Sequence, residues 1–248
     1  MIHFPILRMH SMNVKLKELT LGNALAISYM PPDNEQEEIT AFLRFAIENK
    51  DETPDPALWT VQERMLAIAH YLASMSDEKN FLCSNGARFS DYLDTLQDHV
   101  EPVQKLGEAC GDEWYVVPLT GRLAESIERL QGEVTDGAEN KLPGHLHWII
   151  GAMAAMMRRS AVDETFDMSE SQLDDWIKRG MQVFLAYPES DFSKVVTLWV
   201  KGRLKTDHYF RIDFSEEGIV ALPKEGAHFT PVRFPCRACL SGFTKEMA

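Results

Sequence analysis

The sequence has few of the features that define secreted, membrane-spanning or disulfide-bonded proteins. Its longest apolar stretch, LHWIIGAMAAMM, stops at Arg158, short of the roughly 18–20 residues that a membrane-spanning helix needs. The first residues contain no continuous apolar segment of the kind found in signal peptides. Only four cysteines occur in 248 residues, so we expect free thiols in a reducing compartment and no membrane span.

Short motifs that accompany common catalytic sites are also missing. The chain has no HExxH, GxSxG, GxGxxG or GxxxxGK[ST] pattern, so zincin, α/β-hydrolase, dinucleotide-binding and P-loop functions have no support in the sequence. Acidic residues fall at expected helix starts and in loops, not in apolar runs where burial would raise their pKa. We therefore expect a protein that is not an enzyme.

Positive charge is scarce and dispersed. The chain has 25 basic and 38 acidic residues and a net charge of −13. The densest basic positions are Arg158 and Arg159 and the spaced set Lys201, Arg203 and Lys205. An acidic surface repels phosphate backbones, so we expect no nucleic-acid partner. The charge favours solubility or docking to a basic protein.

Apolar residues follow helical spacing over most of the chain. The spacing predicts its strongest helix over 57–75 and a second strong helix after a Ser169 cap. Thr20 is expected to cap a helix that ends before the prolines at 31–32, and residues 90–100 and 190–202 are also expected to be helical, the latter capped by Ser190.

The period changes near the end of the chain. Residues 208–214, 218–223 and 228–235 alternate or are rich in β-branched side chains, which indicates a small β-meander. We predict a mainly α protein of about seven helices with this C-terminal meander, α+β overall. The expected organisation has three parts: an N-terminal arm (1–13), a helical body (14–204) and a β-rich C-terminal segment (205–248).

Two cysteines, Cys236 and Cys239, lie two residues apart in the stretch FPCRACLSGF. A Cys-x-x-Cys turn supplies two of the four ligands that structural zinc needs. No second pair exists, because Cys83 and Cys110 are isolated in the sequence, although a histidine of the β-rich segment could approach. An iron–sulfur cluster would need all four thiols to converge. Ordinary packing of the thiols is the main expectation, with no cofactor, and a metal site is the alternative.

Both ends of the chain carry apolar residues that have little neighbouring core of their own. We predict that these residues contact partner proteins: Ile2, Phe4, Ile6 and Leu7 in the arm, and Phe229, Val232, Phe234, Leu240 and Phe243 in the C-terminal segment.

Several stretches resemble proteins of tail morphogenesis in tailed bacteriophages. The resemblance is carried by LKELTLGNALAISYMPP (16–32), DPALWTVQERMLAIAHYLA (55–73), GARFSDYLD (86–94), GAMAAMMRR (151–159) and YPESDFSKVVTLWVKG (187–202). At the level of pattern it covers about residues 14–222.

The resemblance implies a non-enzymatic baseplate or tail-tip component, or a tail-assembly chaperone that is absent from the virion. Its implied partners are hub, tape-measure and tail-tip proteins within a multi-subunit assembly, and its implied location is the virion tail, or the host cytoplasm during assembly. Two other functions stay open from the residues: a metal-dependent enzyme using Cys236, Cys239 and a histidine, and an acidic regulatory adaptor.

Overall fold

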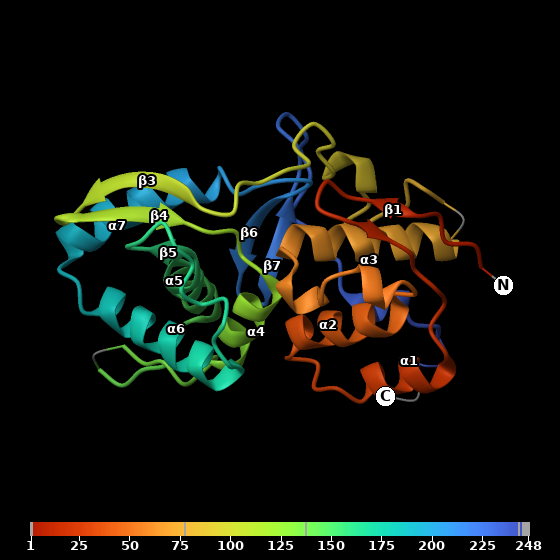
Figure 1. The fold of residues 1–248 in the computed structure, drawn as a ribbon, viewed down its shortest axis with the longest axis horizontal. Helices are drawn as coiled ribbons and strands as arrows, with labels where there is room; N and C mark the ends of the chain where they lie inside the picture. Colours follow the sequence, from red (N-terminus) through yellow and green to blue (C-terminus); the bar gives the residue numbers. More distant parts are fainter. Residues whose placement is uncertain (1, 77, 137, 243, 245–248) are drawn as a thin grey trace. The chain divides into compact units, whose positions relative to one another are not determined.

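The chain folds into helices and small antiparallel sheets that are gathered into two compact units (Figure 1). The structure is a computed structural model, which describes residues 2–76, 78–136, 138–242 and 244. Unit 1 consists of residues 1–99, 208–212 and 220–248. Unit 2 consists of residues 100–207 and 213–219. The mixed α+β class predicted from the sequence is confirmed. The arm, helical body and β-rich segment expected from the sequence were defined by changes of residue pattern along the chain, whereas the two units are defined by which residues lie close together in space.

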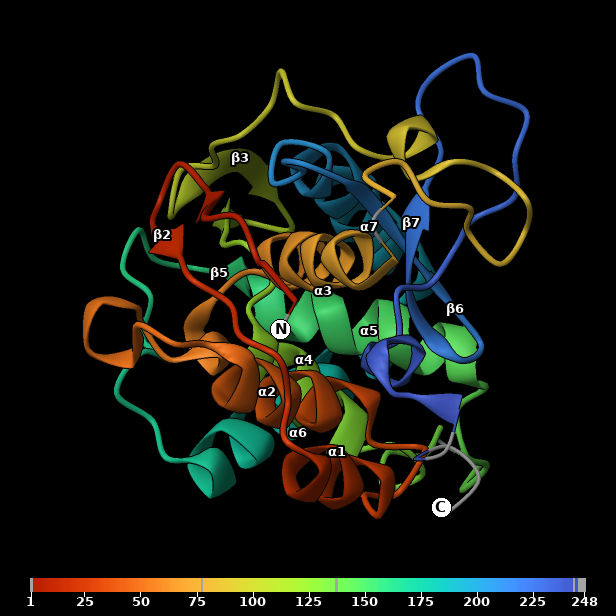
Figure 2. The ribbon, with the colours of Figure 1, turned by 90° about the vertical axis from the view of Figure 1, so that its right-hand side faces the viewer.

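Unit 1 contains helices α1 (Leu21–Ser28), α2 (Glu35–Ala46) and α3 (Val61–Ser76). Every residue of α3 from Val61 to Ala69 is buried, so this helix is enclosed on all sides over its first turns. The chain's last segment packs on α2 and α3, and Figure 2 shows it in blue beside them.

Short elements complete unit 1. The expected arm forms a small hairpin in which β1 (Leu7–Arg8) pairs with β2 (Asn13–Val14). Four single 3-10 turns are described, η1 (Lys50–Glu52), η2 (Pro56–Leu58), η3 (Phe89–Asp91) and η4 (Cys236–Cys239).

Unit 2 combines a three-stranded antiparallel sheet with helices. The strands are β3 (Gln104–Ala109), β4 (Asp112–Val116) and β5 (Met157–Arg158), in the order β3-β4-β5. The helices are α4 (Gly121–Arg129), α5 (Gly144–Met156), α6 (Glu170–Leu185) and α7 (Glu189–Arg203). Helices α4, α5 and α6 pack on one another, and α7 packs on β3 (Figure 1).

Glycine permits close approach at two positions of unit 2. A Cβ on Gly151 of α5 would lie 2.6 Å from Cγ2 of Ile127 on α4, and a Cβ on Gly202 of α7 would overlap Leu106 of β3. At both positions a Cβ would be closer to its neighbour than a normal carbon–carbon contact. Gly151 therefore allows α5 to pack directly on α4, and Gly202 allows α7 to pack directly on β3.

The last two strands are divided between the units. Strand β6 (Arg211–Ser215) and β7 (Gly218–Leu222) are neighbours in a two-stranded sheet. A single antiparallel bridge joins Ala221 to Val232. The pair agrees in part with the predicted C-terminal meander, whose third strand is reduced to this bridge.

Helix boundaries follow the capping residues in several places. The side chain of Thr20 accepts a hydrogen bond from the Asn23 N–H and caps α1. Ser169 and Gln172 form a reciprocal capping box at the start of α6, as the sequence predicted for Ser169. Helix α7 starts at Glu189 with Pro188 at the N-cap, two residues before the expected Ser190 cap.

The helix predicted over 90–100 is wrong. Residues 89–91 form the single turn η3, and the chain then runs without a helix, with Asp94 bridged to Tyr209. The Asp91 side chain accepts from the Arg88 N–H and Asp94 accepts from the Leu96 N–H. Such local side-chain bonds compete with helix formation. Across the described ranges, no helix is long and apolar enough to cross a membrane.

Candidate functional site

The apolar residues of the N-terminal arm differ in how far they are exposed. Ile6 is 49% exposed, whereas Leu7 is buried and Ile2 and Phe4 are half-buried. The Phe4 ring lies 4.8 Å from the ring of Tyr71 on α3, so the arm packs on unit 1. Of these predicted partner contacts, Ile6 offers the most surface to another protein.

The C-terminal apolar residues are mostly enclosed. Val232, Phe234 and Leu240 are at most 6% exposed, whereas Phe229 is 44% exposed. Phe243 lies outside the described residues. Partner contact by this set stays a prediction, and the buried members have a role within unit 1 that the sequence did not indicate.

Phe234 is the centre of an aromatic cluster in unit 1. Its ring packs with four others at centroid distances of 5.7–6.5 Å, namely Phe81, Phe89, Tyr92 and Phe210. The segment before it is held as well, because the Tyr92 hydroxyl and the Asn85 amide both donate to the Thr230 carbonyl at 2.7 Å. The C-terminal segment therefore supplies core side chains to unit 1, which also contains residues 1–99.

The cysteine pair lies on η4 and is buried. Cys236 is fully buried and Cys239 is 6% exposed, and neither is in a disulfide. Across the described part of the chain, no group of three or more His, Cys, Asp or Glu side chains is placed to hold a metal ion. His208, a histidine of the expected β-rich segment, hydrogen-bonds through Nε2 to the Thr60 hydroxyl at 2.9 Å.

Two arginines near these cysteines, Arg233 before the pair and Arg237 within it, form ion pairs with α2. The Arg237 Nε lies 2.9 Å from both carboxylate oxygens of Glu38, and its Nη2 donates to the Met30 carbonyl at 2.7 Å. Arg233 pairs through Nη2 with the Glu35 carboxylate. Glutamates three apart on a helix share one face, so the two pairs attach the C-terminal segment to that face of α2.

Burial dominates the protonation of this cluster. Burial raises the pKa of Glu38, and this effect outweighs the hydrogen bond and the charge of Arg237, which lower it. Burial, followed by the charge of Glu38, raises the pKa of the Cys236 thiol well above its usual value. A protonated thiol is a poor nucleophile and a poor metal ligand, so Cys236 has the character of a packed side chain.

A pocket of about 400 Å³ opens beside these ion pairs. Its lining comes from the start of α2, the end of α3, the turn at 81–84 and the C-terminal segment: Pro32, Glu35, Glu38, Leu72, Phe81, Leu82, Cys83, Ser84, Arg233, Phe234, Pro235, Arg237 and Ala238. Leu82 at this pocket is 61% exposed. Because its glutamates are already paired with arginine, the pocket suits an apolar side chain of another protein better than a charged ligand.

The sequence contains a signal for these ion pairs. Glu35 and Glu38 are three residues apart at the start of α2, and Arg233 and Arg237 are four residues apart in the C-terminal segment, so both pairs have similar spacing.

Comparisons of the chain with models of protein families, with curated proteins and with solved structures found no match.

Proposed function

We propose that the protein is a non-enzymatic component of bacteriophage tail morphogenesis, a baseplate or tail-tip protein that acts through contacts with other proteins. The observation that carries the proposal is the resemblance of residues 16–32, 55–73 and 86–94 to such proteins. The proposed partners are hub, tape-measure and tail-tip proteins, and the proposed location is the virion tail.

The geometry of unit 1 supports a binding role. Ile6, Leu82 and Phe229 each expose more than two fifths of their surface. Of the three, Leu82 lines the pocket of unit 1, and exposed large apolar side chains of this kind are typical of protein contacts. The burial of Cys236 and Cys239 is compatible with a role that needs no thiol chemistry.

Mass spectrometry of purified virus particles tests the proposal directly. We expect the chain in a fixed ratio to the other tail proteins. If the chain occurs with tail intermediates in infected cells but is missing from particles, it is an assembly chaperone and not a structural component. If it associates with no tail protein in either sample, the proposal is overturned.

Incorporation of variants tests the part played by unit 1. We expect Leu82→Asp to reduce incorporation several-fold, because it places a charge at an apolar part of the pocket. Leu96→Asp is the matched control, since Leu96 is 93% exposed in the same unit and does not line the pocket. Equal incorporation of both variants would remove the pocket from the interface.

A further inference from the structure

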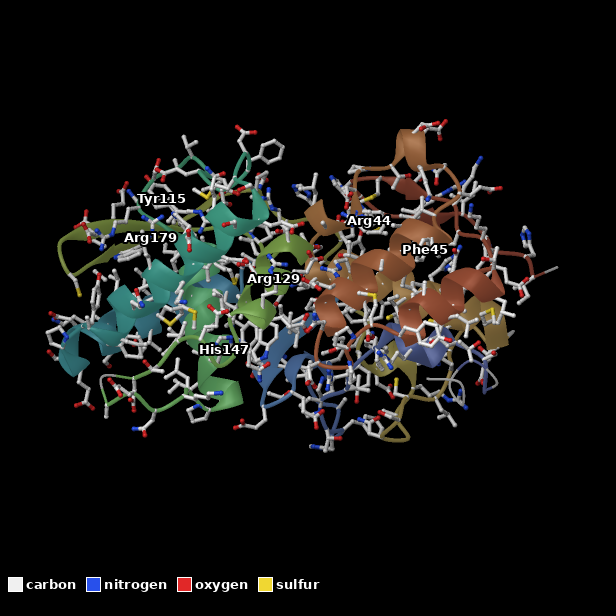
Figure 3. All side chains as sticks on the ribbon, turned by 90° about the horizontal axis from the view of Figure 1, so that it is seen from below. Arg44, Phe45, Tyr115, Arg129, His147 and Arg179 are labelled. Carbon is white, nitrogen blue, oxygen red and sulfur yellow. The ribbon has the colours of Figure 1, made fainter. Side chains whose placement is uncertain are left out.

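A second pocket, within unit 2, combines arginine and tryptophan side chains. Its volume is about 540 Å³, and it is lined by parts of β4, the end of α5 with β5, the loop that follows, and α6. We call it the Arg–Trp pocket. Figure 3 labels Arg179 on α6, which is one of its lining residues.

The floor of the Arg–Trp pocket is apolar and fixed. Trp114, Met157 and Phe184 are each at most 6% exposed, and the rings of Trp114 and Phe184 pack at 6.2 Å. The Arg158 guanidinium lies 4.6 Å above the ring of Trp176. Arg158 also donates to Asp163 and to the Ala155 and Met157 carbonyls, so its donors serve to hold the wall in place.

The rim carries guanidinium groups with donors to spare. Arg179 is exposed, its one described side-chain bond runs from Nε to the Asp175 carbonyl at 3.1 Å, and among the described residues no carboxylate pairs with it. Arg159 is also exposed, lies over the ring of Trp114 and uses only Nη2, for Asp112 and Tyr187.

The charges that face this rim are of both signs. Asp112 and Asp163 pair with Arg159 and Arg158, and Glu164 is the one acidic lining residue that the described part of the chain contributes. With Asp112, Asp163 and Glu164 counted, three arginines face three carboxylates. Arg158 and Arg159 are paired, so the guanidinium that the exposed rim offers without a carboxylate partner among the described residues is that of Arg179.

We propose that the Arg–Trp pocket docks an acidic peptide segment of a partner protein. A carboxylate of the segment binds the free guanidinium edges of Arg179 and Arg159, and a neighbouring aromatic or large aliphatic side chain packs on the floor beside Val183, which is 48% exposed. Tryptophan, arginine, methionine and phenylalanine are the residues enriched at the centres of protein interfaces, and the exposed charged rim admits an extended chain.

The inference rests on the proposed function only in taking the occupant to be a protein. Its test uses purified full-length chain and no virus particles, so either proposal can fail alone. A yeast-displayed library of random twelve-residue peptides is sorted for binding to the labelled chain. We expect enrichment of peptides in which Asp or Glu lies next to an aromatic or large aliphatic residue.

The best enriched peptide is then synthesised and measured by fluorescence anisotropy. We expect Arg179→Gln to weaken its binding at least ten-fold, and added salt to weaken the wild-type complex. Lys201→Gln is the matched control, because it removes the same charge from another exposed position of unit 2. Thermal unfolding verifies that both variants are folded, as expected for an exposed side chain bonded only to its own helix.

Three results would overturn the proposal. The first is a library that yields no acidic motif. The second is binding that Arg179→Gln and Lys201→Gln weaken equally. The third is displacement of the peptide by benzoate at a concentration below that of the peptide itself, which would assign the pocket to a small aromatic carboxylate.

Discussion

Arginine serves opposite purposes in the two pockets. In unit 1, Arg233 and Arg237 each pair with a glutamate of α2, and the Glu38 side chain is only 3% exposed. In unit 2, Arg158 and Arg159 lie over tryptophan rings, and Arg179 has no carboxylate partner among the described residues. In the first pocket both arginines are neutralised by glutamates of the same chain, whereas the second pocket has one guanidinium, that of Arg179, without a carboxylate partner among the described residues.

The difference shows that arginine can either stabilise the fold by pairing with a buried carboxylate or remain available to bind another molecule. A guanidinium that neutralises a buried carboxylate cannot be removed without leaving a buried charge. A guanidinium at an exposed rim contributes little to stability, since solvent screens it, and is available for binding. Substitutions at the two sites should therefore have separable consequences for folding and for association.

The largest effect is expected from the aromatic core of unit 1. Phe234→Ala should lower the free energy of unfolding by about 3–5 kcal/mol, because it leaves a cavity among four aromatic rings. Urea unfolding followed by circular dichroism measures the change. Phe229→Ala, at a 44% exposed position of the same segment, should change it by less than about 0.5 kcal/mol. Similar losses in both variants would mean that the C-terminal segment is not core.

The next effect concerns the ion pair that fastens this segment. Arg237→Gln should destabilise by about 2–3 kcal/mol at pH 7, somewhat below the usual loss for a broken buried pair because Arg237 is 31% exposed. Arg159→Gln, whose pair with Asp112 is exposed on both sides, should cost less than about 0.5 kcal/mol. Equal losses would contradict the contrast between the two pockets.

The same variant has a defined pH dependence. Arg237 supplies the hydrogen bond and the charge that lower the pKa of Glu38, so its removal raises that pKa further above the unfolded value. A carboxyl group with a raised folded pKa favours folding at low pH and loses that contribution as the pH rises through the folded pKa. The deficit of Arg237→Gln should therefore be full at neutral pH and shrink on acidification, and a deficit independent of pH would exclude Glu38 as its cause.

A smaller effect on stability is expected from replacing a helical glycine by alanine in each of the two units. Gly151→Ala should destabilise unit 2 by about 1–2 kcal/mol, since its Cβ would meet buried, β-branched Ile127 at 2.6 Å. Gly22→Ala on α1 has only an ordinary contact at 3.9 Å and should stabilise by up to about 1 kcal/mol through helix propensity. Thermal unfolding should shift in opposite directions, and a shift of the same sign would contradict the close packing of α4 and α5.

The least perturbing experiment labels the thiols of the native chain. Cys110 is exposed, whereas Cys83, Cys236 and Cys239 are buried, and burial raises the pKa of Cys83 to about 11. At pH 8 we expect one fast-reacting thiol in the native chain and four in denaturant, and Cys110→Ser should abolish the fast reaction. Fast labelling of Cys236 or Cys239, or zinc in a one-to-one ratio, would contradict the packed pair.

Local features of the fold could be predicted from the sequence, and long-range pairings could not. The Ser169 cap and the Thr20 cap act within three residues, so adjacent residues indicate them. The failed helix over 90–100 shows the limit, because Asp91 and Asp94 within it bond to nearby backbone N–H groups and compete with the helix that the apolar spacing indicates.

The sequence indicated individual residues of the candidate site but not the contacts between them. Phe234 and Cys236 were singled out as unusual, but Phe234 seemed to have no core because Phe81 and Phe89 lie about 150 residues away in the chain. Glu38 belongs to the acidic residues expected at helix starts, and nothing adjacent in the sequence indicates its partner Arg237, which is 199 residues away. A local pattern reports that a side chain is apolar or charged, and the fold decides which distant residue it meets.

The division of unit 1 between the two ends of the chain has a consequence for its synthesis. A ribosome makes residues 1–99 first, yet Phe210 and Phe234, which complete their aromatic core, emerge after the whole of 100–207. Residues 100–207 can begin to fold while unit 1 still waits for its last strands and η4. A nascent chain arrested before residue 230 should therefore leave Phe81 and Phe89 open to chaperones.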